Sequence, residues 1–541
     1  MKLKLFCCIL AMSFLSFSTP VVDQASAAQE NATIKSYFDT AKGSGGAKSG
    51  ESPKTADKPI TEAPAPTTNA DTGASGDGPI QRAQESLALL APVAKVAAGN
   101  ITTDANTRSV AYENVSITMP DEAPDFEIRI SKITVGGMDA ASYDGNPGDM
   151  TSIEKVAFQE IKLLSGETQM AVLDEYLIEE LSIPYRDTLN TLRESKGTSE
   201  WTESDAFKLA QQWNNFKINL IQANKFQMDV GIAQASLDRI ESRDVSAMSA
   251  GQSFVQNIVV TFQGQQVFSL DKFGYAGVVM PEILNQISQM QNPSEIEQKM
   301  FSIMGDPLGS LNKLAIQELY LDNLQINAPG TIPVTLGKFT CDLLIKDNTA
   351  SLTSKTQELS LPLSKLEDPS DFAILIEAAG NQDLLLDMNL SAKYDAQQKI
   401  TVNSSFSEKK KGSISVDTAY AMVDGTSGAI HSAELKADNK GIIDLLLGAF
   451  ALSEETEGSY NDFLQGVVAI IQSGKEALPE PGLADGVEKA AQLIEKGGTF
   501  RFALTPSSPI NVDDIGSILG TNPSALGYVF EYAAPATPLT R

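Results

Sequence analysis

The sequence predicts an α+β protein that is mainly β: a long curved, bulged antiparallel sheet with helices packed on it and a helix-rich C-terminal part. Three observations lead to this fold class. Strand patterns dominate from about Val110 to Val416, a recurring outline of apolar pairs around polar doublets runs through them, and helical periodicity returns in the last third. Apolar periods of 2 and 3.6 residues are the primary signals for strands and helices.

Residues 1–28 have the order of a secretory signal peptide. Lys2 and Lys4 precede an apolar run of about a dozen residues, which small residues follow at positions 25–28. We therefore expect export, cleavage near Ala27 or Ala28, and a periplasmic or envelope location. Retention of the segment as a membrane anchor is the alternative, although the apolar run is short for a span.

The chain is acidic and poor in cysteine. Its 69 Asp and Glu outnumber 41 Lys and Arg, which gives a formal net charge of -28. Such a charge repels phosphate backbones, so nucleic acid is not an expected partner. Removal of the leader would leave Cys341 as the remaining cysteine, so no intramolecular disulfide could form and stability must come from the core.

Composition divides the chain into a tether and two folded parts. Residues 29–79 are rich in Gly, Pro, Thr and Ser and predict a disordered tether. Residues 80–416 predict a β-rich body with helical insertions, and residues 417–541 an α+β C-terminal part. The helices expected in the body are a short one within Ile80–Ala98 that is interrupted or ends near Pro92, a segment from about 202 to Leu220, and two short pieces between Pro281 and Met304 that are split around Pro293.

One outline recurs in the body: two alternating apolar residues, a doublet, and two more alternating apolar residues. Its clearest copy is Phe268, Leu270, Phe273 and Tyr275 around Asp271 and Lys272. The other copies are Val110, Tyr112, Val115, Ile117; Ile128, Ile130, Ile133, Val135; Val156, Phe158, Ile161, Leu163; Tyr176, Ile178, Leu181, Ile183; Leu319, Leu321, Leu324, Ile326; and Val334, Leu336, Phe339, Cys341. Their spacing along the chain is irregular, which argues against a solenoid of one period.

The doublets predict bulges. In a regular strand, one inserted residue moves all later side chains to the opposite face. A bulge at the doublet absorbs that residue and keeps both apolar pairs on one face while it bends the strand. Two short strands joined at a corner would give the same outline, and the sequence leaves that alternative open. If the bulges form, the residues of a one-sided apolar sheet face include Phe268, Leu270, Phe273, Tyr275, Leu319, Leu321, Leu324 and Ile326.

The last third predicts a hairpin followed by helices. The hairpin turns at Asp395 to Gln398, and helices follow over residues 439–451, around Phe463 to Ile471, and over about Asp485 to Lys496. The glycine pair after Lys496 ends the third helix. Phe500, Phe502 and Leu504 then alternate as a strand, and Asn511 can cap a short helix that runs through Ile518.

Catalytic signatures are scarce. The chain's single histidine, His431, has no neighbouring ligand or triad partners, and a half-buried strand residue is its simplest interpretation. Asp144–Asp149 resembles the start of a calcium loop, but Lys155 stands where that loop needs a carboxylate, so a turn is favoured. Ser407 and Lys410 match one S-x-x-K motif without the companion motifs. We therefore expect no enzyme activity and no catalytic, cofactor-binding or metal-binding residues.

The last 150 residues bring a resemblance. The hairpin Tyr394–Val402, the helix Asn439–Ala451 and the ending Gly497–Leu519 resemble the close of uncharacterised exported alphaproteobacterial proteins. More loosely, the strand outline and the hairpin resemble AsmA-like envelope proteins. That resemblance implies a long curved sheet with an apolar groove that serves envelope lipid handling or outer-membrane homeostasis.

The leading hypothesis is a noncatalytic periplasmic or envelope protein that binds a lipid, another apolar ligand or an envelope protein on its one-sided sheet. Two alternatives remain. One is a structural or surface-interaction protein whose apolar face is a filled core, and the other is an exported hydrolase that uses carboxylates. Ligand identity, oligomeric state and any metal are open at this stage.

Overall fold

The structure, a computed structural model, describes residues 95–539 except 105, 120–122, 138–148, 185–186, 189–215, 284–285, 287–289, 291–292, 306, 329–332, 366–369, 396–398, 424–426, 455–457, 477 and 479. The expected signal peptide and tether lie outside these residues.

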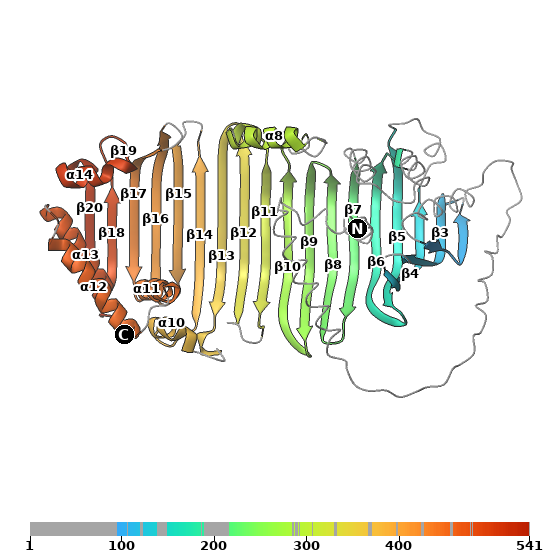
Figure 1. The fold of residues 1–541 in the computed structure, drawn as a ribbon, viewed down its shortest axis with the longest axis horizontal. Helices are drawn as coiled ribbons and strands as arrows, with labels where there is room; N and C mark the ends of the chain where they lie inside the picture. The colour runs from blue at the N-terminus through green and yellow to red at the C-terminus, as the bar shows by residue number, and fades with distance from the viewer. Residues whose placement is uncertain are drawn as a thin grey trace, which may run out of the picture.

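The described residues form one open antiparallel sheet of 20 strands (Figure 1). From β3 to β18 each strand pairs with the next in the chain, while β1 and β2 both pair with β3, and β20 pairs with β18. The strands are β1 Lys95–Ala97, β2 Asn100–Asp104, β3 Ser109–Met119, β4 Ala123–Gly136, β5 Thr151–Ser165, β6 Thr168–Ile183, β7 Lys217–Asp229, β8 Ala233–Ser246, β9 Ser249–Phe262, β10 Gln265–Val279, β11 Ala315–Ile326, β12 Val334–Lys346, β13 Thr349–Leu361, β14 Leu384–Tyr394, β15 Lys399–Glu408, β16 Gly412–Val423, β17 Ser427–Asn439, β18 Gly498–Leu504, β19 Ile510–Asn511 and β20 Tyr528–Ala533.

The described helices lie at the ends of the strands and over the C-terminal end of the sheet (Figure 1). α8 runs along one end of the central strands, and α10 and α11 lie at the opposite end. They are α8 Pro293–Gly305, α9 Pro307–Ser310, α10 Ala373–Ala378, α11 Ile442–Ser453, α12 Tyr460–Glu476, α13 Pro481–Lys496 and α14 Ile515–Thr521, with 3-10 turns at Leu363–Lys365, Ser370–Phe372, Val512–Asp514 and Pro523–Leu526.

Two transverse rows of residues interrupt the ladders, and we call them bulge rows; unlike the predicted bulges, each gap leaves out one residue from both paired strands and keeps the register. In β10 and β11, Leu270 pairs with Leu324 and Lys272 with Asp322, whereas Asp271 and Asn323 between them have no ladder partner. The first bulge row continues this gap across neighbouring strands: Asn114, Ser131, Glu160, Asp174, Lys225, Asp238, Asn257, Asp271, Asn323, Gly337 and Glu358. The second comprises Glu154, Glu180, Asn219, Asp244, Gly251, Gly277 and Gln317.

The two bulge rows keep a constant separation along the strands. Asn219 and Lys225 of β7 differ by six positions, as do Gly277 and Asp271 of β10. Every second strand carries its bulge-row residue in the left-handed region: φ is 54° at Lys225 in the first row and 57° at Gly277 in the second. Antiparallel neighbours therefore alternate between a left-handed and an ordinary backbone at the same level of the sheet.

Side chains of the first bulge row join across adjacent strands. The Asn323 amide donates to the Asp271 carboxylate at 2.7 Å, and the Asn257 amide donates to Asp238 at 2.7 Å. The Ser131 hydroxyl donates to Glu160 at 2.6 Å. These polar contacts link the strands at the points where the backbone ladder is interrupted.

The bulge rows keep most apolar side chains on one side of the sheet, while a smaller buried cluster of Ala157, Leu177 and Leu220 lies on the other side. Contact clusters hold apolar residues from both sides of the interrupted positions: Tyr112 packs with Val115, and Leu173 packs with Tyr176. In a regular strand, residues three positions apart would lie on opposite faces. Each bulge row thus resets the alternation. We call the side that carries these clusters the apolar face and the opposite side the polar face.

Helices cover the C-terminal end of the apolar face. Ile442 and Leu445 of α11 pack on Leu384 and Leu386 of β14. Further along, Leu493 of α13 packs with the cluster formed by β17 and β18. Asn439 fixes the start of α11, since its buried side-chain oxygen accepts from the backbone N–H groups of residues 441 and 443 at 2.9 and 3.2 Å.

Most of the expected C-terminal elements are present. The hairpin turns between β14 and β15, the three helices are α11, α12 and α13, and the side chain of Asn511 accepts from the Asp513 N–H at the start of a 3-10 turn. As predicted, α8 begins at Pro293. The expected division at residue 416 falls within β16, which pairs with strands on both sides, so the sheet runs through it.

One helix boundary was wrong. The helix expected from about 202 to Leu220 does not extend to Leu220, which lies in β7. There strand pairing with β6 determines the conformation, which local periodicity cannot reveal. For the helix expected within Ile80–Ala98, with an interruption or end near Pro92, residues 80–94 lie outside the described part, and Lys95–Ala97 is a strand. No described helix is long and apolar enough to cross a membrane.

Replacing Lys225 by glycine should stabilise the protein. A non-glycine residue in the left-handed region costs about 1–2 kcal/mol, and the entropy cost of glycine offsets about 0.5–1 kcal/mol of that. We expect Lys225→Gly to raise the free energy of unfolding by about 0.5–1 kcal/mol in urea titrations. Lys338→Gly, in β12 and without a positive φ, is the matched control and should be destabilising. Equal losses in both variants would contradict the assignment of the bulge row.

Candidate functional site

The apolar face over β9 to β12 is the candidate site. The eight residues expected on it form four cross-strand pairs between β10 and β11: Phe268 with Ile326, Leu270 with Leu324, Phe273 with Leu321, and Tyr275 with Leu319. Direct cross-strand partners lie on the same face of a sheet. The first two pairs lie on one side of the first bulge row and the other two lie on its far side.

The apolar pairing continues into both neighbouring strands. Leu270 also pairs with Ile258 of β9, and Leu324 also pairs with Leu336 of β12. The positions that share this face carry no charged side chain in the four strands. They are Ala250, Ser253, Val255, Ile258 and Val260 in β9; Phe268, Leu270, Phe273, Tyr275 and Val278 in β10; Ile316, Leu319, Leu321, Leu324 and Ile326 in β11; and Val334, Leu336, Phe339, Cys341 and Leu343 in β12.

The candidate site is less buried than the ends of the same face. Leu270 and Ala250 are buried, but Phe273 is 37% exposed, and most of the aliphatic residues of β11 and β12 on this face are half-buried. Under α10 and α11, by contrast, Leu384 and Leu386 are 4% and 7% exposed. Toward the N-terminus, Leu173 and Tyr176 are 5% and 4% exposed. The apolar face therefore runs from one buried region to another through a stretch that is accessible to solvent.

The few polar atoms on the candidate site are hydroxyl groups and one thiol. The hydroxyls of Ser242 and Ser253 lie 2.6 Å apart. Burial raises the pKa of Tyr275, opposed by its hydrogen bond with Ser253. Burial, and then the neighbouring Asp342 carboxylate, raise the pKa of the free, half-buried Cys341 thiol. These groups stay neutral at neutral pH, so the site can contact apolar chains but offers no charged partner for a charged ligand group.

The polar face has the opposite character. Lys272 extends over the rings of Phe254 and Tyr320 at 4.5 and 5.2 Å, on the side opposite Phe273. Tyr320 lies against Gly274, where an added Cβ would come within 2.7 Å of its hydroxyl. On β8, the buried Glu241 carboxylate pairs with Arg243 at 2.6 Å and also with Arg239. Charged side chains thus lie on this face and not on the candidate site.

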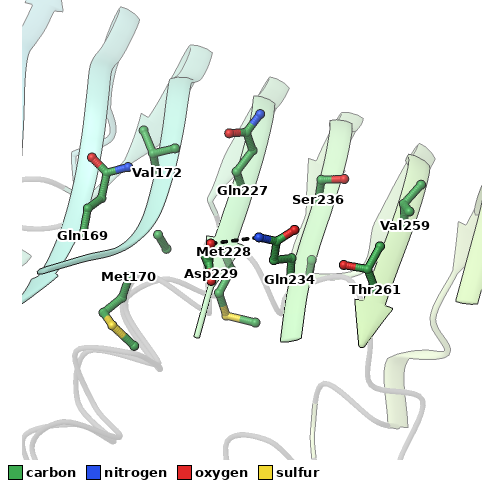
Figure 2. A pocket seen from close by; sticks show the side chains of 12 residues that line it. Gln169, Met170, Val172, Gln227, Met228, Asp229, Gln234, Ser236, Val259 and Thr261 are labelled. Carbon is green, nitrogen blue, oxygen red and sulfur yellow. Dashed lines mark hydrogen bonds between the residues drawn. The ribbon is translucent and has the colours of Figure 1, made fainter. Parts of the chain in front are cut away.

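A hollow of about 400 Å³ lies apart from the candidate site, at the ends of β6 to β9 (Figure 2). Val172, Gln227, Ser236 and Val259 are successive ladder partners that line it from the polar face. Its one carboxylate, Asp229, accepts from the Gln234 amide at 2.9 Å. The other polar groups that line it are the amides of Gln169 and Gln227 and the hydroxyls of Ser236 and Thr261.

The other residues singled out in the sequence are not brought together. His431 is a half-buried residue of β17, as predicted. Ser407 is the residue before the last one of β15, and Lys410 is exposed in the turn that follows. The 144–149 loop lies outside the described residues except for Asp149. Within the described part of the chain, no group of three or more His, Cys, Asp and Glu is placed to hold a metal ion.

Sequence reasoning missed the contribution of β9. Its residues Ser253, Val255, Ile258 and Val260 have the same spacing around a doublet, Gln256 and Asn257, but Ser253 breaks the apolar outline. An outline that allows Ser or Thr at one position would have found this strand.

Truncation should cost less at the candidate site than under the helices. We expect Phe273→Ala to lower the free energy of unfolding by about 1–2 kcal/mol, because part of the ring remains in water. Leu386→Ala, in the core under α11, should cost about 2–5 kcal/mol. Denaturant titrations measure both. A loss at Phe273 as large as that at Leu386 would mean that the site is a filled core.

No family model, curated protein or solved structure matches this chain.

Proposed function

We propose that this chain is a noncatalytic periplasmic or envelope protein that binds acyl chains of lipid on the apolar face between β9 and β12, and so serves envelope homeostasis. The observation that carries the proposal is the absence of charge on that face in four adjacent strands, combined with its partial exposure. The proposal includes a sheet that curves around this face as a groove, and export by the N-terminal segment.

Geometry supports an extended apolar ligand. Neighbouring strands lie about 4.8 Å apart and residues rise about 3.4 Å, so four strands over ten residues span on the order of 600 Å² of sheet, of which the half-buried side chains expose a part. Contiguous exposed apolar area on a monomer often marks a ligand groove or an interaction site. A hydrocarbon chain gains roughly 0.8 kcal/mol for each buried CH₂ group and needs no polar partner.

The distribution of charge also favours this proposal over a catalytic one. Acid–base chemistry needs titratable groups near the bound substrate. On the candidate site the titratable groups are Tyr275 and Cys341, both with a pKa raised by burial. Neither has a base beside it on this face, where the remaining positions are aliphatic, aromatic or serine.

Cys341 offers a direct test, because it is the single cysteine of the described residues and lies on the candidate site. We expect the protein purified from its native envelope to release acyl lipids on solvent extraction. Adding back phospholipid should slow alkylation of Cys341 because bound chains cover the thiol. Mass spectrometry and thiol alkylation kinetics measure the two effects.

Matched variants give the controls. Phe273→Asp places a charge on the candidate site and should abolish both lipid recovery and protection of Cys341. Thr340→Asp places the same charge on the neighbouring polar face, where Thr340 pairs with Tyr320, and should leave both unchanged. Absence of lipid from the wild-type protein, or protection that survives Phe273→Asp, would refute the proposal and favour a structural protein with a filled core.

A further inference from the structure

The strand β20, Tyr528–Ala533, forms the C-terminal edge of the sheet. Among the described residues, β20 pairs on one side with β18 and on its other side with no strand. An unpaired edge of this kind is a template for strand addition, and proteins commonly protect it. This edge is separate from the proposed lipid site on β9 to β12.

The outward-facing groups of β20 follow from one hydrogen bond. The Thr505 N–H donates to the Gly527 carbonyl at 3.1 Å, and this contact extends the β18–β20 register, in which Leu504 pairs with Tyr528. Hydrogen-bonded pairs alternate with non-hydrogen-bonded pairs in an antiparallel ladder. The backbone groups of Tyr528, Phe530 and Tyr532 therefore point away from β18, toward the edge.

The sequence of β20 is complementary to a second copy of itself. Symmetric antiparallel pairing through the outward groups would centre on Phe530 and place Tyr528 opposite Tyr532 of the second copy. Val529 would face Glu531, so no like charges would be opposed. Aromatic cross-strand pairs stabilise such contacts, and a twofold arrangement is the commonest symmetry of soluble homo-oligomers.

Lys489 of α13 donates a hydrogen bond to the backbone carbonyl of Phe530, which lies at the centre of that edge. The Lys489 ammonium donates to the Phe530 carbonyl at 3.0 Å and forms an ion pair with Asp485 at 2.7 Å. The helix is held close to the strand, since an added Cβ at Gly486 would come within 2.5 Å of the Phe530 ring. The guarded carbonyl is the one through which two symmetric strands would meet.

We propose that Lys489 guards the C-terminal edge of the sheet and prevents β20 from pairing with a second copy of this chain. The ammonium satisfies the central outward carbonyl and places a positive charge where the second strand would lie.

The test compares Lys489→Met and Lys489→Ala with the wild type by light scattering and sedimentation over a wide concentration range. Methionine keeps most of the aliphatic stem, and alanine is the strongest helix former, so loss of α13 is avoided in at least one variant. We expect both variants to reach twice the wild-type mass at high concentration. Amide exchange at Phe530 should slow in parallel, because its outward N–H gains an acceptor.

Two controls decide the outcome. Lys489→Arg keeps a donor and a positive charge and should behave as the wild type. Lys475→Met removes a lysine of α12 that pairs with Glu488 at 2.7 Å, away from β20, and should also keep the wild-type mass. The proposal is overturned if folded Lys489→Ala keeps the wild-type mass at every concentration, or if Lys475→Met associates equally.

Discussion

The register of the two bulge rows is the constraint on which the rest of this structure depends. A strand that skips one residue alone would lose its alternation relative to its neighbours. Here the skip recurs at the same level in adjacent strands, so Asp271 meets Asn323 and Lys225 meets Asp238 at interrupted positions. Phe273 and Tyr275 beyond the gap in β10 then meet Leu321 and Leu319 of β11. The sheet thereby keeps one apolar face along strands of 12 to 15 residues in its central part.

This arrangement has a cost that the polar doublets reduce. Residues such as Glu160 and Lys225 adopt positive φ, which is unfavourable for residues other than glycine, asparagine and aspartate. Asn114, Asn257 and Asn323 fill the same role at lower cost. The side-chain contacts between neighbouring row residues replace part of the lost ladder bonding. Since both doublet side chains avoid the apolar face, charge accumulates on one side of the sheet and is absent from the other.

Local sequence reveals that the apolar alternation is interrupted within one strand, but it does not reveal how that interruption aligns with the one in the neighbouring strand. The outline at Phe268–Tyr275 and at Leu319–Ile326 was recognisable, and the hypothesis of an interruption at each doublet came from the strands one at a time. That the two copies pair, doublet against doublet, is a long-range fact. The irregular spacing of the copies reflects insertions such as residues 280–314, which hold α8 and α9 between β10 and β11. It also reflects the second bulge row, to which the copy at Tyr176–Ile183 belongs while the other six copies lie on the first.

Helix burial was harder to predict than helix position. α11 is apolar nearly all round, so periodicity does not distinguish its buried side; Ile442 and Leu445 are buried, whereas Leu446 and Phe450 are 42% and 56% exposed. The candidate site shows the same limit. Sequence identifies the apolar residues of β10 and β11, but their partial exposure depends on how far α10 and α11 reach over the sheet, which is a property of the whole fold.

The distance between Leu321 and Leu324, which flank the first bulge row in β11, tests most directly whether that row places both leucines on one face. In a regular strand, residues three positions apart lie on opposite faces, and their methyl groups are separated by the sheet. Methyl-labelled protein should instead show a nuclear Overhauser effect between the two leucines and between Leu324 and its partner Leu270. An effect between Leu324 and Leu270 with none between Leu324 and Leu321 would show that the alternation is not reset and that the two halves of the apolar face lie on opposite sides.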